Sequence, residues 1–357
     1  MRILIAGASG AIGRPLVHRL RANQHEIFAL ARSPDPAPLK EIGAEPVIAD
    51  ALDAAAVTAA VGRIRPDAVI NELTSLPRRY TPAEMAAAAE RDHKLRVEGN
   101  INLLAALRDA GVRRYLLQSS GFWYAPGVEL ADESVPFISS ASPVVEAGAR
   151  TYMELEARAA ATPGIEFVAL RYGFFYGSGT WYTRDGDMGD QVRRQQVPII
   201  GEGQGVYSFV HIDDAAEATA AALECSPGAY NIVDGNPSPQ PLWLAAFARA
   251  AGAPAPPRVS EEEALRTLGP KAVHYATRFR GTSNSKARRE LEFRPPAQVE
   301  QLIVDGRSWT YMRQSQADAR CADSPTSLCR GRCWSACCPP RLGRLRDRTS
   351  SRGTPTC

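Results

Sequence analysis

Short apolar runs alternate with longer amphipathic stretches along most of the chain. An apolar run of about four to eight residues between turn-forming residues is typical of a buried strand. Such runs predict strands at residues 3–5, 27–31, 46–49, 68–71, 115–118 and 167–170. Helical spacing predicts a long helix at 83–110, with a break in it, and another at 146–161. Nearly continuous apolar strands that alternate with helices predict an α/β protein whose parallel sheet is covered on both faces.

The pattern also divides the chain into regions. Residues 1–171 carry the strand–helix alternation, so we predict one sheet domain there, with returns to the sheet near 206–233. Residues 172–312 are richer in glycine, proline and aromatic side chains, which suits a smaller, mainly substrate-binding region. From 313 to 357 the apolar periodicity disappears, and we interpret this part as a disordered or non-native tail.

Cysteine is concentrated in that tail. Only Cys225 lies in the body of the chain, and six cysteines follow residue 320. A zinc site from Cys329, Cys333, Cys337 and Cys338 is the alternative interpretation, but the spacing is unusual for zinc and no histidine follows His274. We therefore predict no metal.

Composition narrows the function without deciding it. The chain has 45% hydrophobic and 23% charged residues and a net charge of +3, which is ordinary for a globular protein. No basic stripe precedes the tail and no apolar run approaches a membrane span, so neither nucleic acid nor a membrane is an expected partner. With the first strand expected from residue 2, there is no room for a signal peptide, and we expect a cytoplasmic protein.

A glycine-rich turn follows the first apolar run. Gly7, Gly10 and Gly13 are spaced as in G-x-x-G-x-x-G, between a predicted strand and a predicted helix. In a dinucleotide site the first glycine permits the tight turn, the second the approach of the pyrophosphate, and the third close packing of helix on strand. The helix N-terminus then faces the phosphates. The predicted cofactor-binding residues of this turn are Gly7, Ser9, Gly10, Ala11, Ile12 and Gly13. The alternative is a glycine-rich turn of another α/β protein.

At this point the chain resembles the extended short-chain dehydrogenase/reductases, also called the NAD-dependent epimerase/dehydratase family. Several motifs between residues 2 and 310 carry the resemblance besides the glycine turn. They are Asp50-Ala51-Leu52-Asp53, Ser119-Ser120, Leu170-Arg171, Tyr176-Gly177, Ser208-Phe209-Val210-His211-Ile212-Asp213-Asp214, Tyr230-Asn231-Ile232-Val233 and Ser285-Lys286-Ala287-Arg288. The resemblance implies a Rossmann-type doubly wound parallel sheet with a smaller C-terminal substrate-binding region. By analogy alone, the two long helices could also form a homodimer.

The resemblance further places the cofactor. NAD-preferring members carry an aspartate at the end of the second strand, where this chain has Ala31 followed by Arg32. A guanidinium can pair with the 2′-phosphate, so we predict NADP, with NAD as the alternative. Arg32 would otherwise be a solvated loop residue. Family position makes Asp50 the adenine contact, or else a plain turn residue, and puts Ala51 and Arg171 at the same cofactor.

The catalytic residues depart from the family. Its members use a tyrosine as acid/base, a lysine four residues later, and a nearby serine or threonine. Ser120 fits the serine position, and Tyr124 follows it closely, but the chain has no Tyr-x-x-x-Lys. Either Tyr152 is the acid/base and Glu156 replaces the lysine, or Glu156 aligns with a later helix glutamate. In the second register Gly148 replaces the tyrosine and Tyr152 the lysine. Tyr152 could also be only a packed aromatic side chain.

Three functions remain open from the sequence. The first is an NAD(P)-dependent oxidoreductase acting on a small or apolar carbonyl or alcohol, with Ser120 assisting and Tyr152 or Tyr124 donating the proton. The second is a non-catalytic NADP(H)-binding sensor. The third is a nucleotide-sugar epimerase or dehydratase, although Tyr207 and Phe174 stand where sugar-nucleotide enzymes have an arginine and an asparagine.

Overall fold

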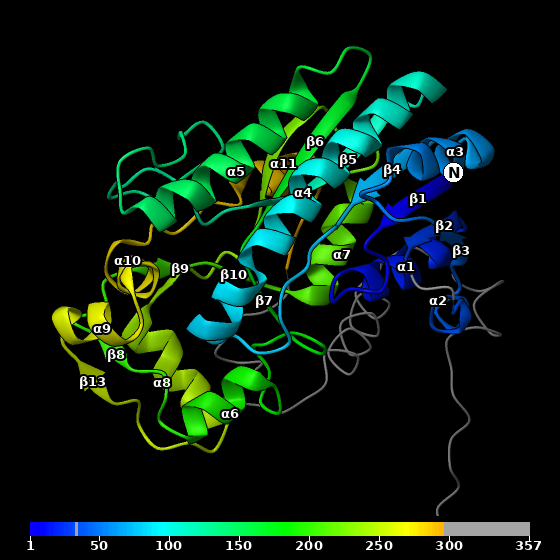
Figure 1. The fold of residues 1–357 in the computed structure, drawn as a ribbon. Coiled ribbons are helices and arrows are strands. Elements are labelled where there is room, and N and C mark those ends of the chain that lie inside the picture. The colour runs from blue at the N-terminus through cyan, green and yellow to red at the C-terminus, as the bar shows by residue number, and fades with distance from the viewer. Residues whose placement is uncertain (33–34, 296–357) are drawn as a thin grey trace, which may run out of the picture. The chain divides into compact units, whose positions relative to one another are not determined.

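The centre of the protein is a seven-stranded parallel sheet (Figure 1). The structure is a computed structural model that describes residues 1–32 and 35–295. The strand order is β11-β6-β5-β4-β1-β2-β3. The strands are β1 (Arg2–Ala6), β2 (Glu26–Ala31), β3 (Glu45–Ile48), β4 (Ala68–Asn71), β5 (Arg114–Ser120), β6 (Glu166–Tyr172) and β11 (Gly228–Ile232). Every predicted strand is present, and the differences are confined to the ends.

Alternate residues of the strands feed two separate cores. On β1, Ile3 and Ile5 face one core while Leu4 and Ala6 face the other. The first core is covered by α1 (Gly13–Ala22), α2 (Ala37–Glu41), α7 (Ile212–Ala221) and α11 (Ser285–Glu290). The second is covered by α3 (Ala54–Ile64), α4 (Pro82–Ala110) and α5 (Pro143–Ala160). Burial of both faces of the sheet explains the nearly continuous apolar runs and confirms the predicted Rossmann-type doubly wound fold.

The long helix α4 corrects one expectation, because it runs without the break that we predicted. Thr81 caps its start by accepting the N–H of Glu84, and Gly111, with φ of 71°, ends it. Its first half is largely exposed, whereas the half after Leu95 packs against the sheet. The apolar periodicity therefore changes with burial, while the backbone stays helical.

The second region follows β6 and has three small sheets. β7 (Phe174–Tyr176) pairs with β10 (Phe209–His211), β8 (Ile199–Ile200) with β13 (Arg258–Val259), and β9 (Val206–Tyr207) with β12 (Ser238–Pro239). Its helices are α6 (Asp187–Arg193), α8 (Gln240–Ala250), α9 (Glu261–Thr267) and α10 (Pro270–Arg278). The expected return to the sheet is correct for β11 and for α7, which packs on it. It is wrong for β9 and β10, because they pair within the second region.

Within the described residues, no helix is both long and apolar enough to cross a membrane. The cysteine-rich stretch at 313–357, with its zinc alternative, lies outside the part of the chain that the structure describes.

Because the main strands are parallel, their carboxyl ends share one edge of the sheet. The glycine turn after β1, Glu72 after β4, Ser120 at the end of β5 and Arg171 near the end of β6 all lie at that edge.

Candidate active site

The glycine turn has the shape that a dinucleotide requires. Gly7 has φ of +99°, and a Cβ on it would lie 2.5 Å from the backbone oxygen of Glu72. A Cβ on Gly13 would lie 2.6 Å from Cα of Ala8. The N–H of Gly10 donates to the oxygen of Gly7 at 3.0 Å. Glycine is therefore required at both ends of the turn, for positive φ and for close backbone approach.

The tip of this turn is open to a ligand. Ser9, Gly10 and Ala11 are exposed, whereas Ile12 is buried beneath them. Helix α1 starts directly behind with no side-chain hydrogen bond capping its N-terminus. Exposed backbone at a helix start suits an anionic phosphate, so this chain's residues fit the nucleotide.

The predicted adenosine contacts lie along the neighbouring strands. Arg32 is exposed directly after β2, and within the described residues no hydrogen bond or ion pair engages its guanidinium. Asp50 follows β3, and its Oδ1 accepts the N–H of Leu52 at 3.0 Å in a turn. Ala51 is buried, with its carbonyl accepting from Asn102 at 2.9 Å. Asp50 thus has a structural role in the turn beside any contact with adenine.

Glu72 is a residue that the sequence reasoning missed. It is 4% exposed, and its Oε1 accepts from the hydroxyl of Tyr172 at 3.1 Å, while its Oε2 is buried with no partner in the described structure. Burial raises the pKa of Glu72 to about 8, although the Tyr172 hydrogen bond and Arg96 act in the opposite direction. The raised pKa favours the protonated, neutral form of this carboxyl at pH 7. The available signal was a polar pair, Asn71-Glu72, at the end of an otherwise apolar strand.

A buried ion pair joins α5 to the end of β6. Arg171 donates from Nε to Oε1 of Glu156 at 2.9 Å and from Nη2 to Oε2 at 2.6 Å. Its Nη1 donates to the hydroxyl of Tyr124 at 2.9 Å, and Ser119 donates to Glu156 at 2.5 Å. The guanidinium of Arg171 is thus engaged by protein groups, and its contact with the cofactor stays a prediction.

The three predicted catalytic side chains differ in their surroundings. Ser120 is buried, and its Oγ accepts the N–H of Phe122 at 3.3 Å. Tyr124 donates to Asn231 at 2.6 Å, and burial raises the pKa of its hydroxyl to about 12. Tyr152 is half-buried beneath the guanidinium of Arg96, which lies 5.4 Å from its ring centre. Burial raises the pKa of Tyr152 as well, and Arg96 partly offsets this.

Trp123 covers the start of α5. A Cβ on Gly148 would lie 2.6 Å from Cη2 of Trp123, so the indole occupies the space where a larger residue at 148 would extend. The ammonium of Lys271 lies 5.4 Å from the centre of the Trp123 ring. Lys271 comes from α10, more than a hundred residues later, which is why sequence spacing could not place it here.

Aromatic side chains fill the second region next to this indole. Phe122 stacks on Phe174 at 4.2 Å, and Phe174 stacks on Tyr207 at 5.3 Å. Tyr207 also lies 5.0 Å from Trp243. Rings that pack against one another therefore make this region apolar.

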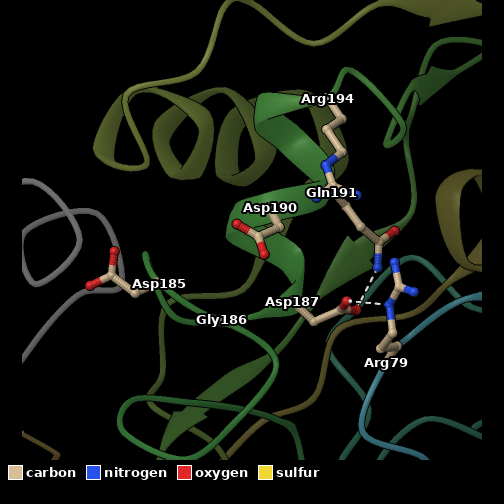
Figure 2. Close-up of a pocket in the computed structure, with 7 residues that line it drawn as sticks. All are labelled: Arg79, Asp185, Gly186, Asp187, Asp190, Gln191 and Arg194. Atoms are coloured by element: carbon tan, nitrogen blue, oxygen red, sulfur yellow. Dashed lines mark hydrogen bonds and ion pairs between the residues drawn. The ribbon is translucent and has the colours of Figure 1, made fainter.

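A polar pocket of about 520 Å³ lies apart from these rings, between the segment before α4 and helix α6 (Figure 2). Its lining residues are Arg79, Asp185, Gly186, Asp187, Asp190, Gln191 and Arg194. It shares no lining residue with the glycine turn or with the Glu156–Arg171 pair.

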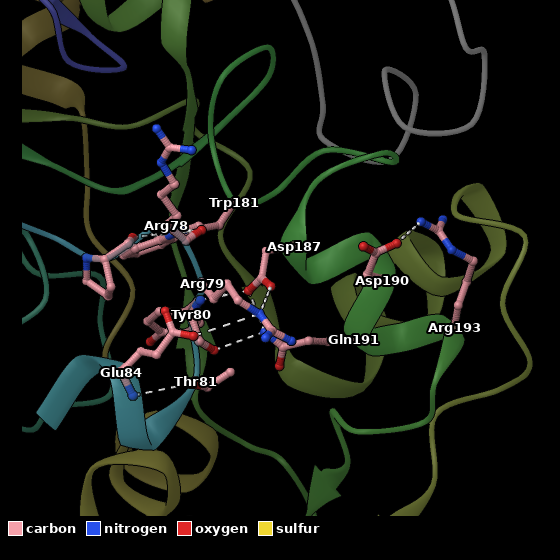
Figure 3. A network of polar contacts seen from close by, with 11 residues as sticks. Arg78, Arg79, Tyr80, Thr81, Glu84, Trp181, Asp187, Asp190, Gln191 and Arg193 are labelled. Atoms are coloured by element: carbon pink, nitrogen blue, oxygen red, sulfur yellow. Dashed lines mark hydrogen bonds and ion pairs between the residues drawn. The ribbon is translucent and has the colours of Figure 1, made fainter. Parts of the chain in front are cut away.

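The pocket wall ties the segment before α4 to the second region (Figure 3). The N–H of Tyr80 donates to Asp187 at 2.7 Å, and Gln191 donates to the carbonyl of Tyr80 at 3.0 Å. Arg79 lies 3.6 Å from Asp187, and the indole of Trp181 donates to the carbonyl of Arg78 at 3.0 Å. These pairings hold the segment that leads from Glu72 to α4 in place.

Comparison with known proteins identifies the family. The sequence pattern of the NAD-dependent epimerase/dehydratase family matches residues 3–233. The chain belongs to the NAD-dependent epimerase/dehydratase family. It is accordingly an NAD(P)-dependent enzyme, as the glycine turn predicted.

Two relatives of this family member are named as reductases. A 3-diazoavenalumate denitrifying reductase from a Streptomyces species is 41% identical over 299 residues, which cover 83% of this chain and 96% of that protein. A 2-alkyl-3-oxoalkanoate reductase from Stenotrophomonas maltophilia is 27% identical over 272 residues, which cover 71% and 77%.

Solved structures of family members share the fold. The UDP-glucose 4-epimerase of Thermus thermophilus, in complex with NAD, superposes with a TM-score of 0.64 at 24% identity, over 85% of this chain and 97% of that one. A human epimerase family protein with NADPH gives 0.65 at 19% identity, over 85% and 98%. Neighbours of this fold therefore hold either nucleotide.

Proposed function

We propose that this chain is an NADPH-dependent reductase that delivers a hydride to a small aromatic substrate without a tyrosine–lysine pair. The observation that carries the proposal is the indole of Trp123 packed over Gly148. The Glu156–Arg171 ion pair supports the register in which Gly148 stands in place of the family's acid/base tyrosine. In that register Tyr152 stands in place of the lysine.

The other acidic groups are poorly suited to replace the missing tyrosine. The hydroxyl of Tyr124 is held between Asn231 and Arg171, and its raised pKa makes it a weak proton donor. The pKa of Tyr152 is also raised by burial. The carboxyl of Glu72 is buried and accepts from the hydroxyl of Tyr172, while the backbone of Glu72 lies against Gly7. A reaction that ends with hydride transfer would need none of them.

Reduction of an aromatic diazonium group is such a reaction. A bound NADPH supplies hydride. The hydride forms the new carbon–hydrogen bond, the carbon–nitrogen bond breaks, and its electron pair leaves with dinitrogen, giving an arene and NADP⁺. No proton is taken up. The similarity to a reductase named for denitrifying 3-diazoavenalumate supports this substrate class.

Carbonyl reduction is the second candidate. It needs a proton on oxygen as well as hydride. The hydroxyl of Ser120 at the end of β5 and the relative named as an oxoalkanoate reductase favour it. Sugar nucleotides are disfavoured, because Tyr207 and Phe174 pack on each other and offer no cation to a diphosphate.

NADPH oxidation by the purified protein tests the two candidates. A benzenediazonium carboxylate should be turned over, with deuterium from 4-deuterated NADPH appearing on the carbon that lost nitrogen, and none from deuterated water. Reactions without protein correct for direct reduction. Turnover of carbonyls alone would replace the first candidate with the second, and tight NADPH binding without any turnover would favour a sensor.

The preference for NADPH rests on Arg32. Replacing the guanidinium by a carboxylate in Arg32→Asp should repel the 2′-phosphate and lower the affinity for NADPH relative to NADH by about ten- to a hundredfold. Fluorescence titration with both nucleotides measures the ratio. Arg63→Asp, an exposed change on α3, is the control. An unchanged ratio in Arg32→Asp would place Arg32 outside the cofactor site.

A further inference from the structure

Lys271 has no use in the mechanism described so far, and its surroundings are unusual for a lysine. Its ammonium lies 5.4 Å from the ring centre of Trp123 and 5.6 Å from that of Tyr275. Among the described residues, no carboxylate pairs with it. Burial lowers the pKa of Lys271, with Arg96 acting in the same direction and Asp92 opposing it. Lys271 therefore lies over two aromatic rings and interacts electrostatically with Asp92 and Arg96 of α4.

Arg96 is a second cation at the same place. Its side chain is 8% exposed, its Nε donates to Oδ2 of Asp92 at 2.8 Å, and its Nη1 lies 3.5 Å from Oε1 of Gln118. The other oxygen of Asp92 accepts the N–H of Ser75 at 2.5 Å. Asp92 is thus fully engaged by protein donors and offers little to Lys271.

The charges here do not balance. Lys271 and Arg96 bring two positive charges, and Asp92 brings one negative charge. Burial raises the pKa of Glu72, whose carboxyl also interacts electrostatically with Arg96, to about 8, which favours its neutral form at pH 7. Uncompensated charge in a partly buried site is unfavourable, so such a site is suited to an anionic ligand.

An unpartnered donor in the same group of residues points the same way. Trp123 is 4% exposed, and its Nε1 is buried with no hydrogen-bond partner in the described structure. Trp123 is also the ring that Lys271 overlies and that covers Gly148. The Trp123 N–H is therefore a buried donor without a protein acceptor, on the ring that Lys271 overlies.

We propose that Lys271, together with Arg96, binds the carboxylate of an aromatic acid substrate. The apolar part of that substrate would pack against the neighbouring rings, of which Phe122 and Phe279 lie 5.8 Å apart. The positive charge of Lys271 thereby selects the substrate. Lys271 lies on α10, far along the chain from the position where family members have their lysine. The inference deepens the proposed function and rests on it for the reacting end of the substrate.

Binding measured without turnover tests this inference separately. In the presence of NADP⁺, cinnamate should bind the wild-type protein more tightly than cinnamamide, its neutral amide. Lys271→Met should weaken cinnamate binding by about ten- to a hundredfold, because a charge-assisted hydrogen bond is lost, and should leave the amide unchanged. Lys271→Arg should restore part of the affinity. Calorimetry gives each dissociation constant, and thermal melting checks that each variant is folded.

Lys286→Met is the matched control, since Lys286 also lies over a ring, 4.1 Å from the centre of Tyr230, but on α11. It should leave both affinities unchanged. Equal binding of acid and amide by the wild type, no binding of either, or an equal loss of both in Lys271→Met would overturn the carboxylate site. Selective binding of the acid without reduction of any diazonium or carbonyl compound would instead contradict only the proposed function.

Discussion

Two parts of the sheet's carboxyl edge, one at β1 and one at β5 and β6, are built in different ways. At β1 the cofactor turn consists of backbone, and its shape depends on three glycines within seven consecutive residues. At β5 and β6 the proposed substrate end consists of side chains from segments far apart in the chain. Trp123, Gly148, Arg171 and Lys271 each come from a different helix, strand or loop.

This difference explains why the cofactor turn has the family's motif while the proposed substrate site lacks the family's Tyr-x-x-x-Lys. A backbone turn fails when a side chain is added, so its sequence pattern is short and strict. A site made of side chains can change its chemistry while the ion pair beneath it is kept. Here the Glu156–Arg171 pair is present, and in the proposed register the indole of Trp123 covers the position of the family's acid/base tyrosine.

Breaking the ion pair should have the largest effect. Arg171→Met leaves Glu156 buried without its partner, which typically costs about 3–5 kcal/mol of unfolding free energy. Denaturant unfolding measures the loss, and Arg108→Met, which removes an exposed pair with Asp109, should change little. The double variant Arg171→Met/Glu156→Leu should be less destabilised than the sum of the single changes. Strict additivity would contradict a direct pairing energy.

Filling the glycine turn with a side chain should have the second-largest effect. A Cβ on Gly10 would already lie 3.2 Å from the oxygen of Gly7, and valine would extend into the space that the pyrophosphate needs. Gly10→Val should therefore weaken binding of either nucleotide by about a hundredfold or more, while the fold is kept. Fluorescence titration measures the affinity. Gly62→Val is the control, because a Cβ on Gly62 of α3 meets nothing within 4 Å. Retained binding in Gly10→Val would contradict the assignment of the turn.

Glu72 follows β4, which lies between the strand of the cofactor turn and the strands of the proposed substrate site. Its backbone lies against Gly7, and its carboxyl accepts from the hydroxyl of Tyr172. Its pKa rises from an ordinary value of 4.5 to about 8 on folding. The folded protein therefore holds a proton that the unfolded chain has lost. Its contribution to stability is fully present below about pH 4.5 and is lost as pH rises to about 8, by up to about 1.4 kcal/mol per pH unit.

Glu72→Gln should remove this slope. The variant should gain stability relative to the wild type as pH rises through that window, and the difference should become constant above about pH 8. Denaturant unfolding at several pH values gives the difference. Asp234, whose pKa burial raises to about 7, titrates in both proteins and so cancels. Parallel pH profiles for the two proteins would show that Glu72 ionises normally.

Much of the fold was predictable, and the exceptions have physical causes. Strand β4 was predicted to the residue, because an apolar run between turns has few other conformations open to it. The break expected in α4 was wrong. The first half of the helix is exposed, so the apolar pattern in its sequence looks interrupted although the helix continues. The pairing of β9 and β10 within the second region depends on contacts between distant residues, which local patterns do not encode.

The sequence by itself determined the parallel sheet, the glycine turn, the family and the absence of a Tyr-x-x-x-Lys. Each of these depends on neighbouring residues or on a strict spacing. Only the tertiary structure decided that Glu156 pairs with Arg171, that Trp123 covers Gly148, that Glu72 is buried against Gly7, and that Lys271 reaches the same site. These contacts join residues from separate segments, and burial sets their charge states, so they exist only once the chain has folded.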